Sequence, residues 1–125
     1  MRNYDPHQTP DPEQWLKLNE SLRLELVAAY HRATNAELPN ATLHASFHAI
    51  VENQLAEGMA EVQNALDRLL NEGLDRHDAV HAIGSVLAEQ IIGIGKDPLS
   101  NETPDKAYFQ GLEMLTAEKW QKSGK

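Results

Sequence analysis

The sequence predicts an all-α fold: an up-and-down bundle of four helices followed by a fifth, C-terminal helix. Apolar residues recur at the three- and four-residue spacing of a helix face, and no segment alternates as a half-buried strand does. Short connections rich in Gly, Pro and Asn separate these segments, which favours antiparallel neighbours. The chain has 125 residues, 41% of them hydrophobic, which suits a single domain with one modest core.

The domain organisation is predicted from the start of the chain. Residues 1–10 contain two prolines and are expected to form a flexible N-terminal arm, in which His7 is exposed to solvent. Residues 11–125 are expected to form one helical-bundle domain. The N-terminus lacks the apolar segment of a secretory signal, and no apolar run approaches the length of a membrane span, about 18 residues. We therefore expect a cytoplasmic protein.

Start and stop signals divide the domain into five expected helices, over residues 12–34, 41–57, 60–72, 76–92 and 104–121. Asp11 and Asp75 are suitable N-caps for the first and fourth of these helices. Gly58 and Gly73 end the second and third, since glycine is the commonest residue just beyond a helix. Arg76 is expected to be an exposed charge at the start of the fourth helix, and the alternative is that it binds a carboxylate or phosphate there.

The composition excludes several classes of site and partner. The chain has no cysteine, which rules out disulfides, iron–sulfur clusters and thiolate ligands, so any metal must be held by nitrogen and oxygen. A net charge of −8 repels phosphate groups, so neither nucleic acid nor an anionic membrane is an expected partner. No motif for an organic cofactor is present, because Gly93-Ile94-Gly95 follows a helix and has no preceding strand.

Four of the six histidines lie in two similar heptapeptides. The first runs from His44 to Ile50 and the second from His77 to Ile83, and both read H-x-x-[FV]-H-A-I. Residues four apart share one edge of a helix. In an up-and-down bundle the second and fourth helices are parallel, and the two motifs would differ in height by about 3 Å. We therefore expect the two histidine pairs to meet at one end of the bundle.

The histidines and a nearby carboxylate form a candidate metal site. Glu52 continues the first edge, in the order His44-x3-His48-x3-Glu52. Imidazole nitrogen and carboxylate oxygen suit zinc, iron or manganese. The predicted ligands are His44, His48, Glu52, His77 and His81. Three further residues are expected to orient these ligands through hydrogen bonds: Glu25, His31 and Glu89.

Two other interpretations stay open. The histidines can be structural, hydrogen-bonding across a helix interface, and the positive end of a helix disfavours a cation. The protein can also be a non-enzymatic interaction module that forms a homodimer or larger homo-oligomer through its last helix. That helix is apolar on more than one face, through Tyr108, Phe109, Leu112, Met114 and Leu115. If the chain is an enzyme, a metal-dependent hydrolase or oxidase is conceivable, but no motif identifies a substrate.

The order of these residues resembles a family of bacterial proteins catalogued as domain of unknown function 1841. The likeness covers about residues 39–92 and consists of Pro39-Asn40, His44-x3-His48-x3-Glu52-x-Gln54 and Asp75-x-His77-x3-His81. Ser85 departs from the family, which often has an acid there, whereas Glu89 matches a second family acid. No activity is assigned to the family, so the resemblance implies the fold unit and the residues of interest and no reaction.

Overall fold

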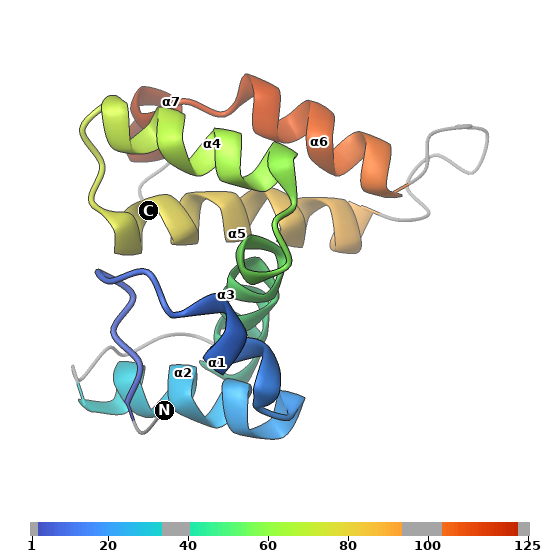
Figure 1. Ribbon diagram of the computed structural model, residues 1–125. Helices are drawn as coiled ribbons and strands as arrows, with labels where there is room; N and C mark the ends of the chain where they lie inside the picture. Colours follow the sequence, from blue (N-terminus) through green and yellow to red (C-terminus); the bar gives the residue numbers. More distant parts are fainter. Residues whose placement is uncertain (1–2, 34–40, 94–103, 123–125) are drawn as a thin grey trace.

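The computed structural model describes residues 3–33, 41–93 and 104–122, and every regular element in these ranges is a helix (Figure 1). The all-α prediction is therefore confirmed for the part of the chain that is described. None of the helices in these ranges is long and apolar enough to cross a bilayer. The helices are α1 (Pro12–Lys17), α2 (Glu20–Ala33), α3 (Ala41–Ala56), α4 (Ala60–Asn71), α5 (Arg76–Gly93), α6 (Pro104–Met114) and α7 (Ala117–Lys122).

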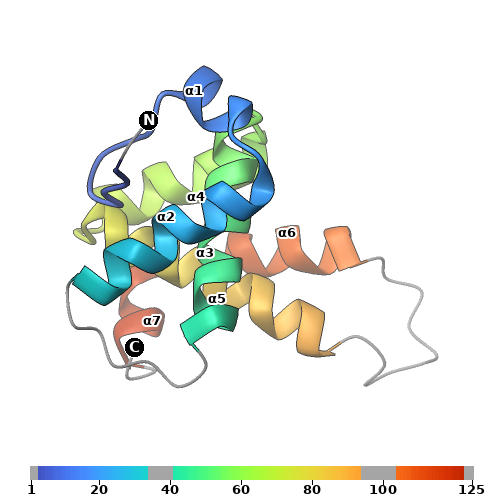
Figure 2. The same cartoon turned by 90° about the horizontal axis from the view of Figure 1, so that it is seen from below.

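The up-and-down arrangement of four helices is not confirmed. In Figure 1, α4, α5 and α6 lie side by side across the view, whereas α3 is seen nearly along its axis. Figure 2 shows the same crossing from another side, with α2 lying over α3. Helix α3 therefore stands between two groups of helices, with α1 and α2 on one side and α4 and α5 on the other.

The interior consists of two apolar clusters that share α3. One cluster joins α3 to the C-terminal helices and includes Val51, Leu69 and Ile83, all fully buried. The other joins the N-terminal segment, α1 and α2 to the opposite face of α3, around Trp15 and Val27. Burying apolar side chains on both faces fixes the position of α3.

Two of the five expected helices are each broken into two. Leu18 is extended, with φ −74° and ψ 145°, and Asn19 then accepts a hydrogen bond from the Leu22 N–H at 2.8 Å, as an N-cap does. Arg23 donates to the Leu18 carbonyl at 2.9 Å, which compensates for the interrupted helix. The expected continuous helix from residue 12 is therefore wrong, and its end near Thr34 lies outside the described residues.

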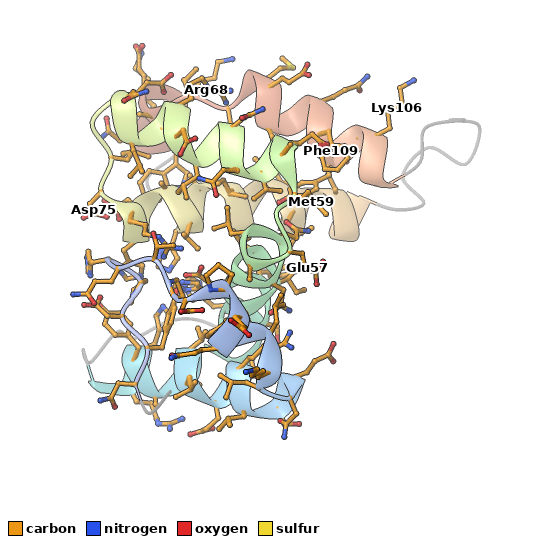
Figure 3. The ribbon with its side chains drawn as sticks, in the orientation of Figure 1. Glu57, Met59, Arg68, Asp75, Lys106 and Phe109 are labelled. Carbon is orange, nitrogen blue, oxygen red and sulfur yellow. The ribbon has the colours of Figure 1, made fainter. Side chains whose placement is uncertain are left out.

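The last expected helix is broken in the same way. Thr116 caps α7 by accepting from the Lys119 N–H at 3.1 Å. Arg68 of α4 (Figure 3) donates to the carbonyls of Leu112 and Leu115, at 2.5 and 2.9 Å, and the Leu112 carbonyl also accepts from the Leu115 N–H at 3.3 Å. The other three helices match their expected ranges closely, because Gly58 and Gly73 follow the ends of α3 and α4, and Asp75 caps the start of α5.

The N-terminal segment is more tightly held than the expectation of a loose arm implied. Tyr4 is 5% exposed and Pro6 is fully buried, and the Pro6 carbonyl accepts a hydrogen bond from Arg76 at 2.8 Å. His7, in contrast, is exposed as expected. The segment therefore contributes to the interior and reaches α5, which lies about 70 residues further along the chain.

Two glycines at helix crossings should respond oppositely to a methyl group. A Cβ on Gly111 would lie 2.7 Å from Val86 Cγ1, whereas a Cβ on Gly84 would meet Phe47 and Val51 at 3.9 Å. We expect Gly111→Ala to lower the free energy of unfolding by about 1–2 kcal/mol, because Val86 is stiff and must shift. Gly84→Ala should raise it by about 0.5–1 kcal/mol, since alanine is the better helix former.

Urea denaturation of both variants measures this difference. Equal stability of Gly111→Ala and the wild type would mean that α5 and α6 are less closely packed than described.

Candidate metal centre

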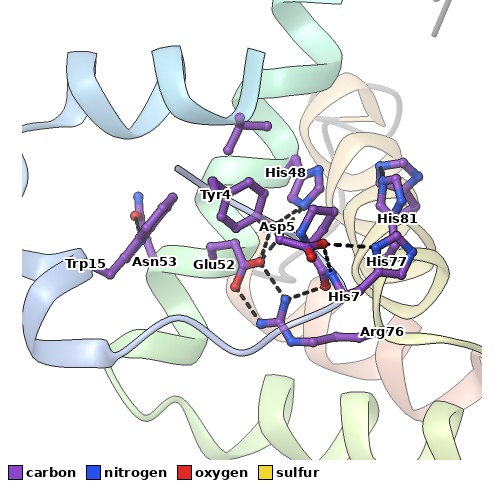
Figure 4. A network of polar contacts seen from close by, with 12 residues as sticks. Tyr4, Asp5, His7, Trp15, His48, Glu52, Asn53, Arg76, His77 and His81 are labelled. Atoms are coloured by element: carbon purple, nitrogen blue, oxygen red, sulfur yellow. Dashed lines mark hydrogen bonds and ion pairs between the residues drawn. The ribbon is translucent and has the colours of Figure 1, made fainter. Parts of the chain in front are cut away.

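All six histidines of the sequence meet in one cluster. They come from the N-terminal segment, α2, α3 and α5, and Figure 4 shows part of the cluster. Neighbouring ring centroids are 4.1–5.2 Å apart, through the pairs His77–His81, His44–His81, His31–His44, His48–His81 and His7–His77. The two histidine pairs therefore meet as expected, but the up-and-down bundle at whose end they were placed is not confirmed.

Four of the imidazoles can hold one metal ion. His31, His44, His48 and His81 each offer a ring nitrogen, and these four nitrogens lie within 4.8 Å of one another. The Nε2 of His81 lies 3.0 Å from that of His44 and 3.4 Å from that of His31. Nitrogens bound to zinc at about 2.0–2.1 Å stand about 3.3–3.4 Å apart in a tetrahedron. The observed spacing is close to that of a ligand set.

The contacts around His81 exceed what hydrogen bonding can satisfy. Its Nε2 also lies 3.0 Å from the Nε2 of His77, so three imidazole nitrogens surround it. A neutral imidazole nitrogen carries either one proton or one lone pair, and makes one linear hydrogen bond. A cation accommodates several rings at once, because each turns a lone pair toward the same point.

The tautomer of His31 is set by its own helix. The Nδ1 of His31 lies 2.8 Å from the carbonyl oxygen of Val27, one turn earlier in α2, and must therefore donate to it. This leaves the Nε2 lone pair on the side of His81. A backbone carbonyl that binds the second ring nitrogen is a usual way to orient a metal-binding histidine.

His48 is oriented by a chain of buried polar groups (Figure 4). The Tyr4 hydroxyl donates to Glu52 Oε2, and its oxygen lies 2.6 Å from His48 Nε2, which places the donating proton on Nε2. The other nitrogen, Nδ1, is buried and has no hydrogen-bond partner within the described part of the chain. His48 is 2% exposed, so bulk solvent does not satisfy this lone pair.

Glu52 is held by Arg76. Arg76 Nη2 lies 2.7 Å from Glu52 Oε1, and Arg76 Nη1 lies 2.8 Å from Glu52 Oε2. The side chains of Arg76 and Glu52 are 7% and 1% exposed. The carboxylate therefore stabilises a cation of the protein itself, and the structure does not bring it into the four-histidine set. The expectation that Arg76 is an exposed charge is wrong, whereas the alternative, that it binds a carboxylate, agrees with its contacts to Glu52.

The other expected site residues are distributed as follows. His77 is half-buried and lies beside the four-histidine set, next to His81. His31, expected to orient the ligands, is itself one of the four residues. Glu25 is 61% exposed and pairs with Arg32, and Glu89 is exposed on α5, so neither is grouped with the histidines.

Burial favours the neutral form of four of the histidines. Burial, and then the positive charge of neighbouring histidines, lowers the pKa of His81 to about 2 and that of His77 to about 4. The same causes lower the pKa of His44, and hold that of His48 well below its usual range. Neutral imidazole is the form that binds metal, so these four rings have, at neutral pH, the form that a metal ligand requires.

Tyr4 and Arg76 were not predicted as parts of the site. Burial, and then the charge of Glu52, raises the pKa of Tyr4, so its hydroxyl stays a donor. Burial lowers the pKa of Arg76, but the hydrogen bonds and charge of Glu52 outweigh burial and raise it. One signal in the sequence could have indicated a residue such as Arg76. A carboxylate on a core-facing helix edge, as Glu52 is, needs a buried cation as its partner.

No protein-family model, no curated protein and no solved structure matches this chain. The site therefore defines the class by its own geometry: a small helical protein with a histidine-rich, cysteine-free centre that could hold a metal ion. Membership of the family catalogued as domain of unknown function 1841 stays a prediction.

Removing Arg76 should destabilise the protein strongly. Arg76→Met leaves Glu52 buried without a counter-charge, which we expect to cost about 3–5 kcal/mol of unfolding free energy. The matched control is Arg32→Met, because the Arg32–Glu25 pair is 64% and 61% exposed. Loss of that pair should cost no more than about 1 kcal/mol. Urea denaturation compares the two variants, and equal losses would contradict the buried ion pair.

The metal-free protein should lose stability as the pH falls. An unfolded histidine titrates near pH 6.5, whereas the pKa values of folded His77 and His81 are about 4 and 2. Below pH 6.5 the unfolded chain binds protons that the folded chain does not, so unfolding becomes more favourable. We expect a lower melting temperature at pH 5 than at pH 7, measured after chelator treatment.

A glutamine at position 81 provides the control, since it does not titrate. The melting temperature of His81→Gln should therefore differ less between pH 5 and pH 7 than that of the wild type does. Identical wild-type melting temperatures at pH 5 and pH 7 would contradict the neutral, buried state of these rings.

Proposed function

We propose that this protein binds one divalent transition-metal ion through His31, His44, His48 and His81. The observation that carries the proposal is the approach of four imidazole nitrogens to within 4.8 Å of one another. Zinc and iron suit an all-imidazole set better than manganese does, because manganese favours carboxylate and water oxygen. Glu52, the nearest predicted carboxylate ligand, is bound by Arg76 and is not free to supply that oxygen.

The charge of such an ion has partial compensation in the fold. His31 lies in the last turn of α2, and the C-terminal end of a helix carries partial negative charge. This contribution offsets the unfavourable positive ends of α3 and α5, where the paired heptapeptides begin. The net charge of −8 further favours cations over anions near the protein.

The geometry favours metal binding over metal-dependent catalysis. A structural site fills all four positions with protein ligands, whereas a catalytic zinc usually keeps one position for water. Four histidines would complete a tetrahedral sphere, so hydrolase and oxidase chemistry have no open position to use. We therefore assign no reaction.

The homo-oligomer through the last helix stays a prediction. Tyr108, Leu112 and Leu115 are buried within the chain, and Phe109 is half-buried. Met114 is 67% exposed and is the apolar residue of this helix that is available to a partner. These burials give the interaction module less support than the histidine cluster gives the metal site.

Elemental analysis of untagged protein, purified without chelator, tests the proposal. We expect one equivalent of zinc or iron per chain, and none in the double variant His48→Ala/His81→Ala, which removes two of the four ligands. The matched control is Glu25→Gln/Glu89→Gln, which changes two exposed acids outside the cluster and should keep its metal.

A blank wild-type sample, repeated after incubation with each metal and desalting, would contradict the proposal. The histidines would then be structural. In that case the double variant would lose stability while chelator left the melting temperature of the wild type unchanged.

A further inference from the structure

We infer that a divalent cation reaches the four-histidine site through an access edge formed by Asp5, His7, Asp75 and His77. The inference rests on the proposed function, because it describes the route to that site. The four residues join the N-terminal segment to the start of α5 (Figures 3 and 4), on the outer side of His81.

The outer part of the access edge has the chemistry to attract a hydrated cation. The Nδ1 of His7 lies 3.0 Å from Asp5 Oδ1, and its Nε2 lies 3.9 Å from Asp75 Oδ2. All three side chains are about half exposed, at 46%, 48% and 55% respectively. Exposed carboxylates bind hydrated cations weakly, which suits capture and release more than storage.

His77 connects this outer part to the interior. Its ring centroid lies 5.2 Å from that of His7, and its Nε2 lies 3.0 Å from the Nε2 of His81. Exposure falls along the same path, from the exposed His7 through the half-buried His77 to His48 at 2%. A cation bound to His77 is therefore already next to one of the four proposed ligands.

The opposite side of the site is closed. Tyr4, Glu52 and Arg76 are buried and hydrogen-bonded to one another beside His48. Arg76 also holds the carbonyl of Pro6, which keeps the N-terminal segment over this side. A cation passing there would have to break a buried ion pair, which costs about 3–5 kcal/mol. The access edge offers a path without that cost.

A residue on the path changes rates without changing the equilibrium. Replacing His77 should slow binding and release by the same factor, because both use the same route, and should leave Kd unchanged. A residue that is a ligand in the final site behaves differently, since its loss raises Kd. The two roles can therefore be separated by measuring both rates.

Stopped-flow uptake of Co²⁺ by the metal-free protein tests the inference, because the visible absorption of Co²⁺ reports its coordination geometry. His77→Leu keeps the bulk of the side chain and removes its ligand atoms. We expect at least tenfold slower uptake and equally slowed release to a chelator, with the final spectrum and stoichiometry of the wild type.

A second variant changes only charge. In Asp5→Asn/Asp75→Asn, the amide oxygens can still accept from the His7 and Asp78 N–H groups, as the carboxylates do at 2.9 and 2.8 Å. Uptake should be slower than in the wild type at low salt, and the difference should shrink at high salt as the charges are screened. Glu89→Gln, on α5 but away from the cluster, should behave as the wild type does.

The result that overturns the inference is His77→Leu uptake within twofold of the wild-type rate, as expected for a route past the half-buried His44. A changed final spectrum or a raised Kd would overturn it too, since His77 would then be a ligand. Absence of Co²⁺, Zn²⁺ and Fe²⁺ binding by the wild type would instead refute the proposed function, and the inference with it.

Discussion

The buried pair of Glu52 and Arg76 is the interaction on which the rest of the site depends. Two opposite charges inside a protein are stable only when their remaining hydrogen-bonding groups also find partners. Here Tyr4 and the carbonyl of Pro6 supply two such partners, and Arg76 Nε has none among the described residues. The pair and its partners join the N-terminal segment, α3 and α5. The same chain of contacts orients His48, which connects the stability of the fold to the geometry of the histidine cluster.

Much of the secondary structure could be predicted from the sequence, for a local reason. Helices α3 and α4 end just before Gly58 and Gly73, which have positive φ values of 77° and 105°, and α5 begins after Asp75, which accepts from the Asp78 N–H. The breaks at Leu18 and before α7 were missed because the apolar stripe continues across them. The steep crossing of α3 depends on contacts between distant segments, which periodicity does not encode.

The candidate site was predictable to a similar extent. His44, His48 and His81 were identified because their spacing places them on helix edges, and these residues do meet. His31 was expected in a supporting role because it lies outside the repeated motif. Tyr4 escaped prediction altogether, since its partners are 44 and 48 residues away in the sequence. Because His31 comes from α2 and His81 from α5, a bound ion would also connect helices on opposite sides of α3.

The position of the N-terminal segment also has a consequence for synthesis on the ribosome. Tyr4 and Pro6 leave the ribosome well before Arg76, which holds Pro6 and follows it 70 residues later. Contacts so distant along the chain form late, because a long loop must close before they contribute. Tyr4 and Pro6 are therefore translated before α5 but are among the last residues to reach their final positions, and the histidine cluster can be completed only when α5 has emerged.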